Sequence, residues 1–201
     1  MNRPSKIVCV GRNYRAHAKE LGNEVPAEPL LFFKPPSSLL APGSAIVLPS
    51  VSSQVEFEGE IGVVVGQLLR HAHEDEAAAA VQGILALNDV TARDLQKTDG
   101  QWARAKGFDT FCPIGPPSTE VTDLANLTVV TRVNGEERQR GSSADMVFSI
   151  PALLAYISRI MTLEPGDIVA TGTPAGVGRL EPGDIVEVEV EGLSRVSNPV
   201  A

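Results

Sequence analysis

Residues 56–65 read EFEGEIGVVV, so that three carboxylates at alternate positions lead directly into an apolar run. Side chains on a β-strand alternate between its two faces, and Glu56, Glu58 and Glu60 are therefore predicted to share one face. Beyond Glu60 both faces are apolar, which is typical of a strand that enters a buried sheet. The stretch predicts a core strand whose acidic end lies at the rim of the interior.

This acidic face has two interpretations. Burying an unpaired carboxylate costs several kcal/mol, and oxygen coordination of Mg²⁺ or Ca²⁺ is one efficient compensation. The other interpretation is a half-solvated strand face without a metal. Residues 186–191, VEVEVE, alternate more regularly but never become apolar on both faces. They are predicted to form a strand with one face in water, and no chemistry is assigned to them.

Length and composition narrow the class of protein. The 201-residue chain, 43% apolar and 21% charged, suits a single globular domain spanning residues 1–201. Its 18 glycines and 15 prolines indicate many turns and short strands and disfavour a helix bundle. A net charge of -8 without a clustered basic face argues against a nucleic-acid partner. No apolar run approaches the ~20 residues of a membrane span, so we expect a soluble, cytoplasmic protein without a membrane partner.

A candidate general base lies near the N-terminus. Residues 12–21 contain good helix formers and end before Gly22 and Asn23, which stop a helix. On a helix His17 and Glu20 share a face, so that Glu20 can orient the imidazole and raise its basicity. The alternative from this spacing is a surface ion pair.

Two predicted apolar strands lead to charged residues. Residues 30–34 predict a buried strand, and Lys34 at its end is expected to extend its ammonium group to water. Residues 84–87 predict a second strand, which leads to Asp89. Asp89 has two possible roles: it caps the next segment, or it is a third carboxylate of a hard-cation site.

Other stretches have plainer interpretations. Residues 101–111, which include Lys106, mix polar and aromatic residues and predict a loop. Cys9 and Cys112 lie in apolar or aromatic surroundings, which predict buried, reduced thiols. A nucleophilic cysteine is the alternative, although no histidine is near either one in sequence.

The second half of the chain is rich in turn signals. Residues 127–133 predict a strand that enters a hairpin at Asn134-Gly135, and Ser149 begins a helix that runs to about Met161. The heptapeptide LEPGDIV occurs at 163–169 and at 180–186, and each copy predicts a turn that starts a strand.

A glycine-rich connector separates the two copies of the heptapeptide. Residues 171–178, TGTPAGVG, lack the lysine of a phosphate loop, although their backbone amides can hold an anion.

Together these segments resemble the fumarylacetoacetate hydrolase family from Lys6 to about Gly192. The matching segments are GRNY at 11–14 with His17 and Glu20, FKP at 33–35, EGE at 58–60, DVTARD at 89–94, AKGFD at 105–109, and GD at 166–167 with TGTP at 171–174. The length is that of the short single-domain members, which include acylpyruvate hydrolases and oxaloacetate decarboxylases. The resemblance implies an α+β, mainly β fold, a mixed β-roll with few helices, and a homodimer.

The resemblance also implies a site. Its Mg²⁺ or Mn²⁺ ligands are Glu58, Glu60 and Asp89, and Glu56 is a neighbour of the metal without binding it. His17 and Glu20 become a base dyad on a segment, residues 12–24, that orders as a lid in relatives. Some acylpyruvase-like members carry two histidines where this chain has Glu56-Phe57, so the chain departs from their pattern at this point.

The implied activity is metal-dependent hydrolysis of a C–C bond in an acylpyruvate or a related 2,4-dioxo acid. His17 and Glu20 would activate the water, and Lys106 would stabilise negative charge on the substrate. Arg12, Gln96 and Thr173 would bind the small anionic 2-oxo acid. The alternatives are isomerisation of a 2-hydroxyhepta-2,4-diene-1,7-dioate-type acid or decarboxylation of oxaloacetate through the same enolate. A non-catalytic cation-binding module is a third interpretation, against which the base dyad argues.

Overall fold

Two β-sheets form most of the fold in the computed structural model, which describes residues 3–20, 22, 24–120 and 123–201. The five-stranded sheet has the order β2-β1-β11-β5-β6, and the four-stranded sheet has the order β10-β9-β13-β14. The strands of the first are β1 (Ile7–Gly11), β2 (Leu30–Lys34), β5 (Gly59–Val65), β6 (Val81–Asn88) and β11 (Ile168–Ala170). Those of the second are β9 (Thr128–Val133), β10 (Glu136–Ser142), β13 (Ile185–Val190) and β14 (Ser194–Pro199).

The remaining elements are short. Two small sheets contain β12-β4-β7 and β3-β8. Their strands are β3 (Leu39–Leu40), β4 (Val55–Phe57), β7 (Thr91–Ala92), β8 (Cys112–Pro113) and β12 (Gly178–Arg179). The helices are α1 (Arg15–Glu20), α2 (Glu74–Ala79), α3 (Arg93–Thr98), α4 (Ala103–Lys106) and α5 (Ile150–Ile160), with 3-10 turns η1 (Pro36–Ser38) and η2 (Ser143–Asp145). The prediction of a mainly β fold with few helices is confirmed.

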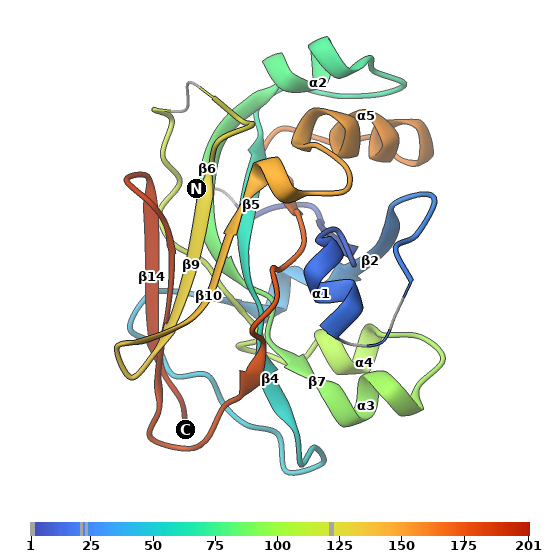
Figure 1. The fold of residues 1–201 in the computed structure, drawn as a ribbon. Coiled ribbons are helices and arrows are strands. Elements are labelled where there is room, and N and C mark those ends of the chain that lie inside the picture. The colour runs from blue at the N-terminus through green and yellow to red at the C-terminus, as the bar shows by residue number, and fades with distance from the viewer. Residues whose placement is uncertain (1–2, 21, 23, 121–122) are drawn as a thin grey trace.

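The main core lies between the two sheets and α5. Its members include Val8, Ile61, Val129, Leu153 and Val188, each at most 1% exposed. Burying one such side chain stabilises the fold by roughly 1.5–3 kcal/mol. In Figure 1 the four-stranded sheet lies on one side of β5 and β6, and α1, α3 and α4 lie on the other side. The candidate site residues come from strand ends and helices on that second side.

Local signals in the second half of the chain are confirmed. Asn134 and Gly135 have φ values of 53° and 83°, the left-handed conformations that a tight β9–β10 turn requires. Gly166 and Gly183, which occupy equivalent places in the repeated heptapeptide, both have φ of 93°. The predicted helix from Ser149 is α5, and the Ser149 hydroxyl accepts a hydrogen bond from the Ala152 amide at its N-terminus.

The acidic stretch at 56–65 does not form the single strand that its alternation predicts. It contains β4 and β5, which belong to different sheets, and Glu58 lies between them. The Glu58 amide donates to the side chain of Asn88 at 3.0 Å instead of continuing the strand ladder. The break places Glu58 where two sheets meet.

The predicted helix over residues 12–21 begins only at Arg15. Arg12 has a φ of 60°, and the Asn13 side chain is held by the backbone of Phe148 and Thr171. These long-range contacts compete with the first helical turn. Two positions of this predicted segment, Leu21 and Asn23, lie outside the described residues.

Two further expectations from sequence are wrong. The segment 101–111 contains α4, whose last residue is Lys106, and is not entirely a loop. The strand β2 is partly exposed, with Phe33 at 47%, because it is an edge strand paired only with β1. Among the described residues, no helix is long and apolar enough to cross a membrane.

Candidate active site

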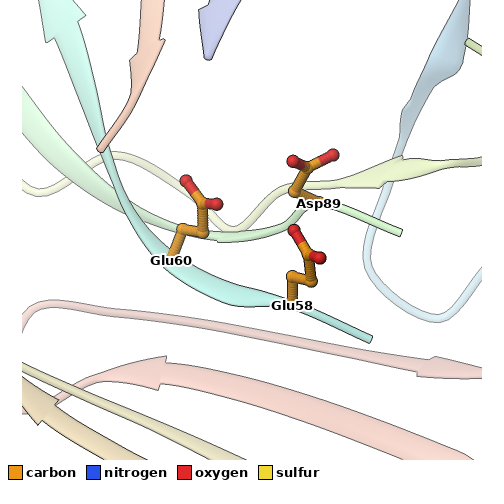
Figure 2. A group of neighbouring side chains, drawn as sticks. All are labelled: Glu58, Glu60 and Asp89. Carbon is orange, nitrogen blue, oxygen red and sulfur yellow. The ribbon is translucent and has the colours of Figure 1, made fainter. Parts of the chain in front are cut away.

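Three carboxylates meet where β4, β5 and β6 come together (Figure 2). The ladder that pairs Gly59 of β5 with Asn88 of β6 places Asp89 beside Glu58, and the Asp89 amide donates to the Glu58 carbonyl at 2.8 Å. One carboxylate oxygen from each of Glu58, Glu60 and Asp89 lies within 4.8 Å of the other two. The three residues are 5%, 1% and 0% exposed.

Gly59 makes this close arrangement possible. A Cβ atom at this position would lie 1.8 Å from the Thr131 hydroxyl oxygen on β9, so any side chain would push the two strands apart. The Gly59 amide donates to Gln139 at 2.9 Å, and its carbonyl accepts from the Thr173 hydroxyl at 2.9 Å. Both the amide and the carbonyl of Gly59 are thus held by side chains, which fixes the backbone between Glu58 and Glu60.

Three buried cations surround the carboxylates. The Lys106 ammonium donates to Glu58 at 2.8 Å and to Asp89 at 2.6 Å. Lys34 donates to the other Asp89 oxygen at 2.7 Å, and the Arg93 guanidinium donates to Glu58 at 2.5 Å. Ion pairing of this kind is what makes the burial of several charges tolerable.

Lys34 does not extend to water as its position at a strand end predicts. It is 1% exposed, and its ammonium donates to Asp89 and to the carbonyls of Val90 and Lys106 at 3.0 and 2.6 Å. Asp89 is also not a helix cap, because the N-terminus of α3 has no side-chain cap. Asp89 instead lies beside Glu58 and Glu60 as the third carboxylate of the cluster, the position that the predicted hard-cation site requires.

The electrostatics of Glu58 and Glu60 differ. Burial works to raise the pKa of Glu58, but the charges of Lys106 and Arg93 outweigh it and lower that pKa below its usual range. Burial and the charges of Asp89 and Glu58 raise the pKa of Glu60 well above its usual value. The Glu60 carboxylate accepts a hydrogen bond from the Gly172 amide at 2.8 Å. That amide belongs to the glycine-rich connector, which the sequence predicts can hold an anion. The group that it binds is the protein's own Glu60 carboxyl group.

A hard divalent cation fits this donor set. Three buried carboxylates supply the oxygen ligands that Mg²⁺ and Mn²⁺ prefer, and a cation would relieve the mutual repulsion that acts on Glu60. Each carboxylate oxygen has more than one lone pair, so its existing hydrogen bond leaves it able to bind a cation. Glu58, Glu60 and Asp89 are therefore the residues that could hold the metal.

His17 and Glu20 are in contact, as their helical spacing predicts. His17 Nδ1 lies 3.1 Å from Glu20 Oε2, and His17 is 5% exposed. The other Glu20 oxygen accepts from the Gly176 amide at 3.0 Å, which links α1 to the glycine-rich connector. Because the Glu20 carboxylate can only accept a hydrogen bond, Nδ1 carries the hydrogen and Nε2 is left as the basic nitrogen of the imidazole.

Glu58, Glu60 and His17 line one cavity of about 60 Å³. Asp89 does not line it but contacts Lys106, which does. The cavity walls include the predicted residues Arg12, Gln96, Lys106 and Thr173, together with Trp102. The Thr173 hydroxyl donates to Gly59 and accepts from Gln139, so this group is already engaged within the protein. The structure therefore brings every predicted site residue to the cavity or into contact with a residue that lines it.

Sequence reasoning missed Lys34, Arg93 and Gln139. Lys34 and Arg93 lie inside the matching segments 33–35 and 89–94, and that location was the available signal for a role. Gln139 is 1% exposed because the ladder of β10 shifts register between Glu137 and Gln139. Such an irregularity redirects a side chain, and the pattern of residues in β10 does not reveal it.

The two cysteines are buried, free thiols, as predicted. Burial raises the pKa of Cys112 to about 12 and raises the pKa of Cys9 well above its usual value. The reactive thiolate is therefore disfavoured at both positions.

The fold and the acidic cavity are those of a mainly β protein with a candidate divalent-metal site. Residues 6–201 match the family model described as fumarylacetoacetate (FAA) hydrolase C-terminal. The chain belongs to the fumarylacetoacetate hydrolase family.

Relatives in this family carry several functional names. The chain is 48% identical to an uncharacterised protein of Methanocaldococcus jannaschii, over 98% of this chain and 84% of that protein. It is 47% identical to a mitochondrial oxaloacetate tautomerase of Arabidopsis thaliana, over 96% of this chain and 89% of that protein. A crystal structure of fumarylpyruvate hydrolase from Pseudomonas aeruginosa with Mn²⁺ and pyruvate is 32% identical, with a TM-score of 0.92 over 98% of this chain and 90% of that one.

Proposed function

We propose that the protein is a divalent-metal-dependent enzyme that tautomerises or decarboxylates a small 2-oxo diacid of the oxaloacetate type. The observation that carries this proposal is that Glu58, Glu60, His17 and Lys106 line one cavity of about 60 Å³, with Asp89 completing the carboxylate cluster behind it. Sites for drug-sized ligands are usually larger, roughly 300–1,000 Å³, so this cavity favours an acid of few carbons. The oxaloacetate tautomerase from Arabidopsis thaliana, 47% identical, supports the same choice.

When bound at Glu58, Glu60 and Asp89, Mg²⁺ or Mn²⁺ would supply Lewis-acid polarisation of the 2-oxo group. Nε2 of His17 would take a proton from the carbon next to that group, and Glu20 would stabilise the resulting imidazolium. Lys106 uses two of its three N–H donors on Glu58 and Asp89. Its third donor would stabilise the enolate oxygen.

Tautomerisation and decarboxylation differ in the fate of one bond. In tautomerisation, His17 returns the proton to the enolate at oxygen or at carbon. In decarboxylation, the keto form keeps that proton and the bond from the same carbon to the distal carboxylate breaks instead. CO₂ leaves, the bonding pair forms the enolate, and a proton from solvent is then delivered to that carbon. Arg12 and the Gln96 amide would bind the carboxylates of the diacid.

Hydrolytic cleavage of an acylpyruvate is the second candidate. It is supported by the contact between His17 and Glu20, which suits activation of a water, and by the likeness to fumarylpyruvate hydrolase. Hydrolysis requires space for both the acyl group and the water. The small cavity therefore places this candidate after the first.

Product analysis of the purified protein with Mg²⁺ or Mn²⁺ tests both candidates. Oxaloacetate, acetylpyruvate, fumarylpyruvate and a hydroxymuconate-type diacid are each supplied with and without chelator. We expect chelator-sensitive loss of the oxaloacetate enol or release of CO₂. The Asp89→Asn variant at the same metal concentration controls for catalysis by free ions. Chelator-sensitive pyruvate plus a free acid from an acylpyruvate would instead establish the hydrolase, and no reaction with any of the four acids would contradict the proposal.

The homodimer that the family resemblance implies is also a proposal. Light scattering after size exclusion should give a mass twice that of one chain, and a mass equal to one chain would contradict it.

A further inference from the structure

Glu56 is the acidic residue of the opening stretch that the proposed chemistry leaves without a role. It lies on β4, where it pairs with Thr91 of β7 and Arg179 of β12, and it is 8% exposed. Among the described residues, the carboxylates that converge as a metal site are Glu58, Glu60 and Asp89, and Glu56 is not one of them. A buried charge in this position requires an explanation.

Arg93 connects Glu56 to the cavity. Its Nε donates to Glu56 at 2.7 Å, and one terminal nitrogen donates to the ligand Glu58 at 2.5 Å. The other terminal nitrogen donates to Gln96 Oε1 at 2.5 Å. Because a guanidinium group is planar and rigid, the Nε contact with Glu56 sets the direction of both other contacts.

The Glu56 carboxylate is itself held from the opposite side. Gln54 Nε2 donates to its second oxygen at 2.6 Å, and the Arg93 backbone amide donates to the Gln54 carbonyl at 2.7 Å. Arg93 is 3% exposed, so water does not substitute for these partners. Glu56 therefore lies behind the cavity wall and holds Arg93, which lines the cavity, in a fixed position.

The contacts of Arg93 act on two functional groups. At Glu58, the positive guanidinium of Arg93 and a bound cation would compete for the same carboxylate. The negative charge of Glu56 partly neutralises the guanidinium and so weakens its hold on Glu58. At Gln96, Arg93 is only a donor, so the amide oxygen must face it. The Gln96 NH₂ group is then left as the donor on the cavity side.

We propose that Glu56 is a positioning residue that, through Arg93, orients both the metal ligand Glu58 and the cavity amide of Gln96. This inference rests on the proposed function, because it assumes a cation at Glu58 and an anionic ligand at Gln96.

The first test is titration of the full-length protein with Mn²⁺, followed by calorimetry. Glu56→Gln keeps the size and one acceptor oxygen of the side chain but removes its charge. We expect the Kd for Mn²⁺ to rise about tenfold, the lower end of the effect that partners of metal ligands usually have. Glu189→Gln is the matched control, because it removes the same charge from a surface ion pair with Arg132. Its Kd should equal that of the wild type.

The second test uses pyruvate as the probe with Mg²⁺ at saturation. Trp102 is the only tryptophan and lines the cavity, so its fluorescence reports pyruvate binding without turnover. Glu56→Gln and Gln96→Ala should each weaken pyruvate binding severalfold. The double variant should be no weaker than the weaker single variant, because both changes act on one contact.

The outcomes separate this inference from the proposed function. Wild-type protein that binds no Mn²⁺ would overturn the proposed function and this inference together. Wild-type binding with a Glu56→Gln affinity within about twofold would overturn this inference alone. Additive effects of Glu56→Gln and Gln96→Ala on pyruvate binding would overturn the connection to Gln96. Melting temperatures of all variants, measured by circular dichroism, confirm that each protein is folded.

Discussion

His17 lies near the candidate metal site but is not one of its predicted ligands. It lines the cavity but is not among the converging carboxylates, and its partner is Glu20. We therefore predict that His17→Ala lowers kcat by roughly 10²–10⁴, the usual contribution of a general base. The Kd for Mn²⁺ should stay within about twofold of the wild type. Steady-state kinetics on the acid identified by product analysis, together with metal titration, measure both quantities.

A His17→Ala variant with unchanged kcat would exclude His17 as the base. Glu20→Gln is the companion variant, because it keeps the shape of the side chain but weakens stabilisation of the imidazolium. Its kcat should fall less than that of His17→Ala.

Glu60 is the least compensated carboxyl group of the metal-free cluster, because burial and the charges of Asp89 and Glu58 oppose its ionisation and raise its pKa. Two other carboxylates lie close to it, while the hydrogen bond that it accepts comes from the neutral backbone amide of Gly172. Glu60→Gln retains the acceptor for Gly172 and removes the repulsion. We predict that the metal-free variant melts at a higher temperature than the metal-free wild type, by roughly 2–4 °C for each kcal/mol relieved. Scanning fluorimetry with chelator measures this difference.

The same variant should gain no stability from Mn²⁺, since it lacks one of the three ligands. A metal-free Glu60→Gln protein that melts below the wild type would show that the carboxylate charge is compensated in the folded state.

At the scale of elements, the repeated heptapeptide provides an internal comparison of two turns. Asp167 and Asp184 occupy equivalent positions, and each accepts a backbone hydrogen bond at 2.8 Å from the residue three places before it. Asp167 is also buried against Ser5 and Lys6 at the start of β1, whereas Asp184 contacts Asn134 near the surface. We predict that Asp167→Ala costs about 2–4 kcal/mol of unfolding free energy and Asp184→Ala about 0.5–1.5. Chemical denaturation of both variants measures the difference.

The Asp167 penalty should depend on pH. Burial works to raise the pKa of Asp167, but hydrogen bonds from Lys6, Glu164 and Ser5 lower it below its ordinary value of 3.8. A carboxyl with a lowered pKa in the folded state stabilises above the unfolded pKa, and this stability is lost as pH falls through the folded pKa. The gap between wild type and Asp167→Ala should therefore be constant near neutral pH and shrink below about pH 4. Equal penalties for the two aspartates at neutral pH would contradict the comparison.

At the scale of the whole molecule, the candidate site connects elements that are distant in sequence. Its carboxylates join β4, β5 and β6, and Lys106 joins them to α4. A cation bound only by the folded arrangement stabilises that arrangement by RT ln(1 + [L]/Kd). We predict that Mn²⁺ at about 100 times its Kd adds roughly 2.7 kcal/mol, which corresponds to about 5–11 °C in Tm. Thermal melts across a Mn²⁺ titration test this.

Glu58→Ala should abolish that shift, and Glu189→Gln should retain it. A shift of equal size in Glu58→Ala would place the stabilising cation elsewhere on the protein.

Features that depend on neighbouring residues could be predicted from the sequence. The β9–β10 turn follows from Asn134-Gly135, because few other residues adopt positive φ at low cost. The contact between His17 and Glu20 follows from their spacing on a helix. The alternation of residues 56–65 placed three carboxylates on one face, although it did not reveal the break at Glu58 between two sheets.

The sequence by itself determined the tight turns and many of the short strands, because these depend on neighbouring residues. The motifs shared with the family implied the mainly β fold and the residue types of the candidate site. Only the tertiary structure decided which cations accompany those carboxylates. Lys34 reaches Asp89 across 55 positions, Arg93 reaches Glu56 across 37, and Gln139 reaches Gly59 across 80. Such pairs form because burial leaves each charge or amide no water to bind, and which partner meets which depends on how the sheets pack.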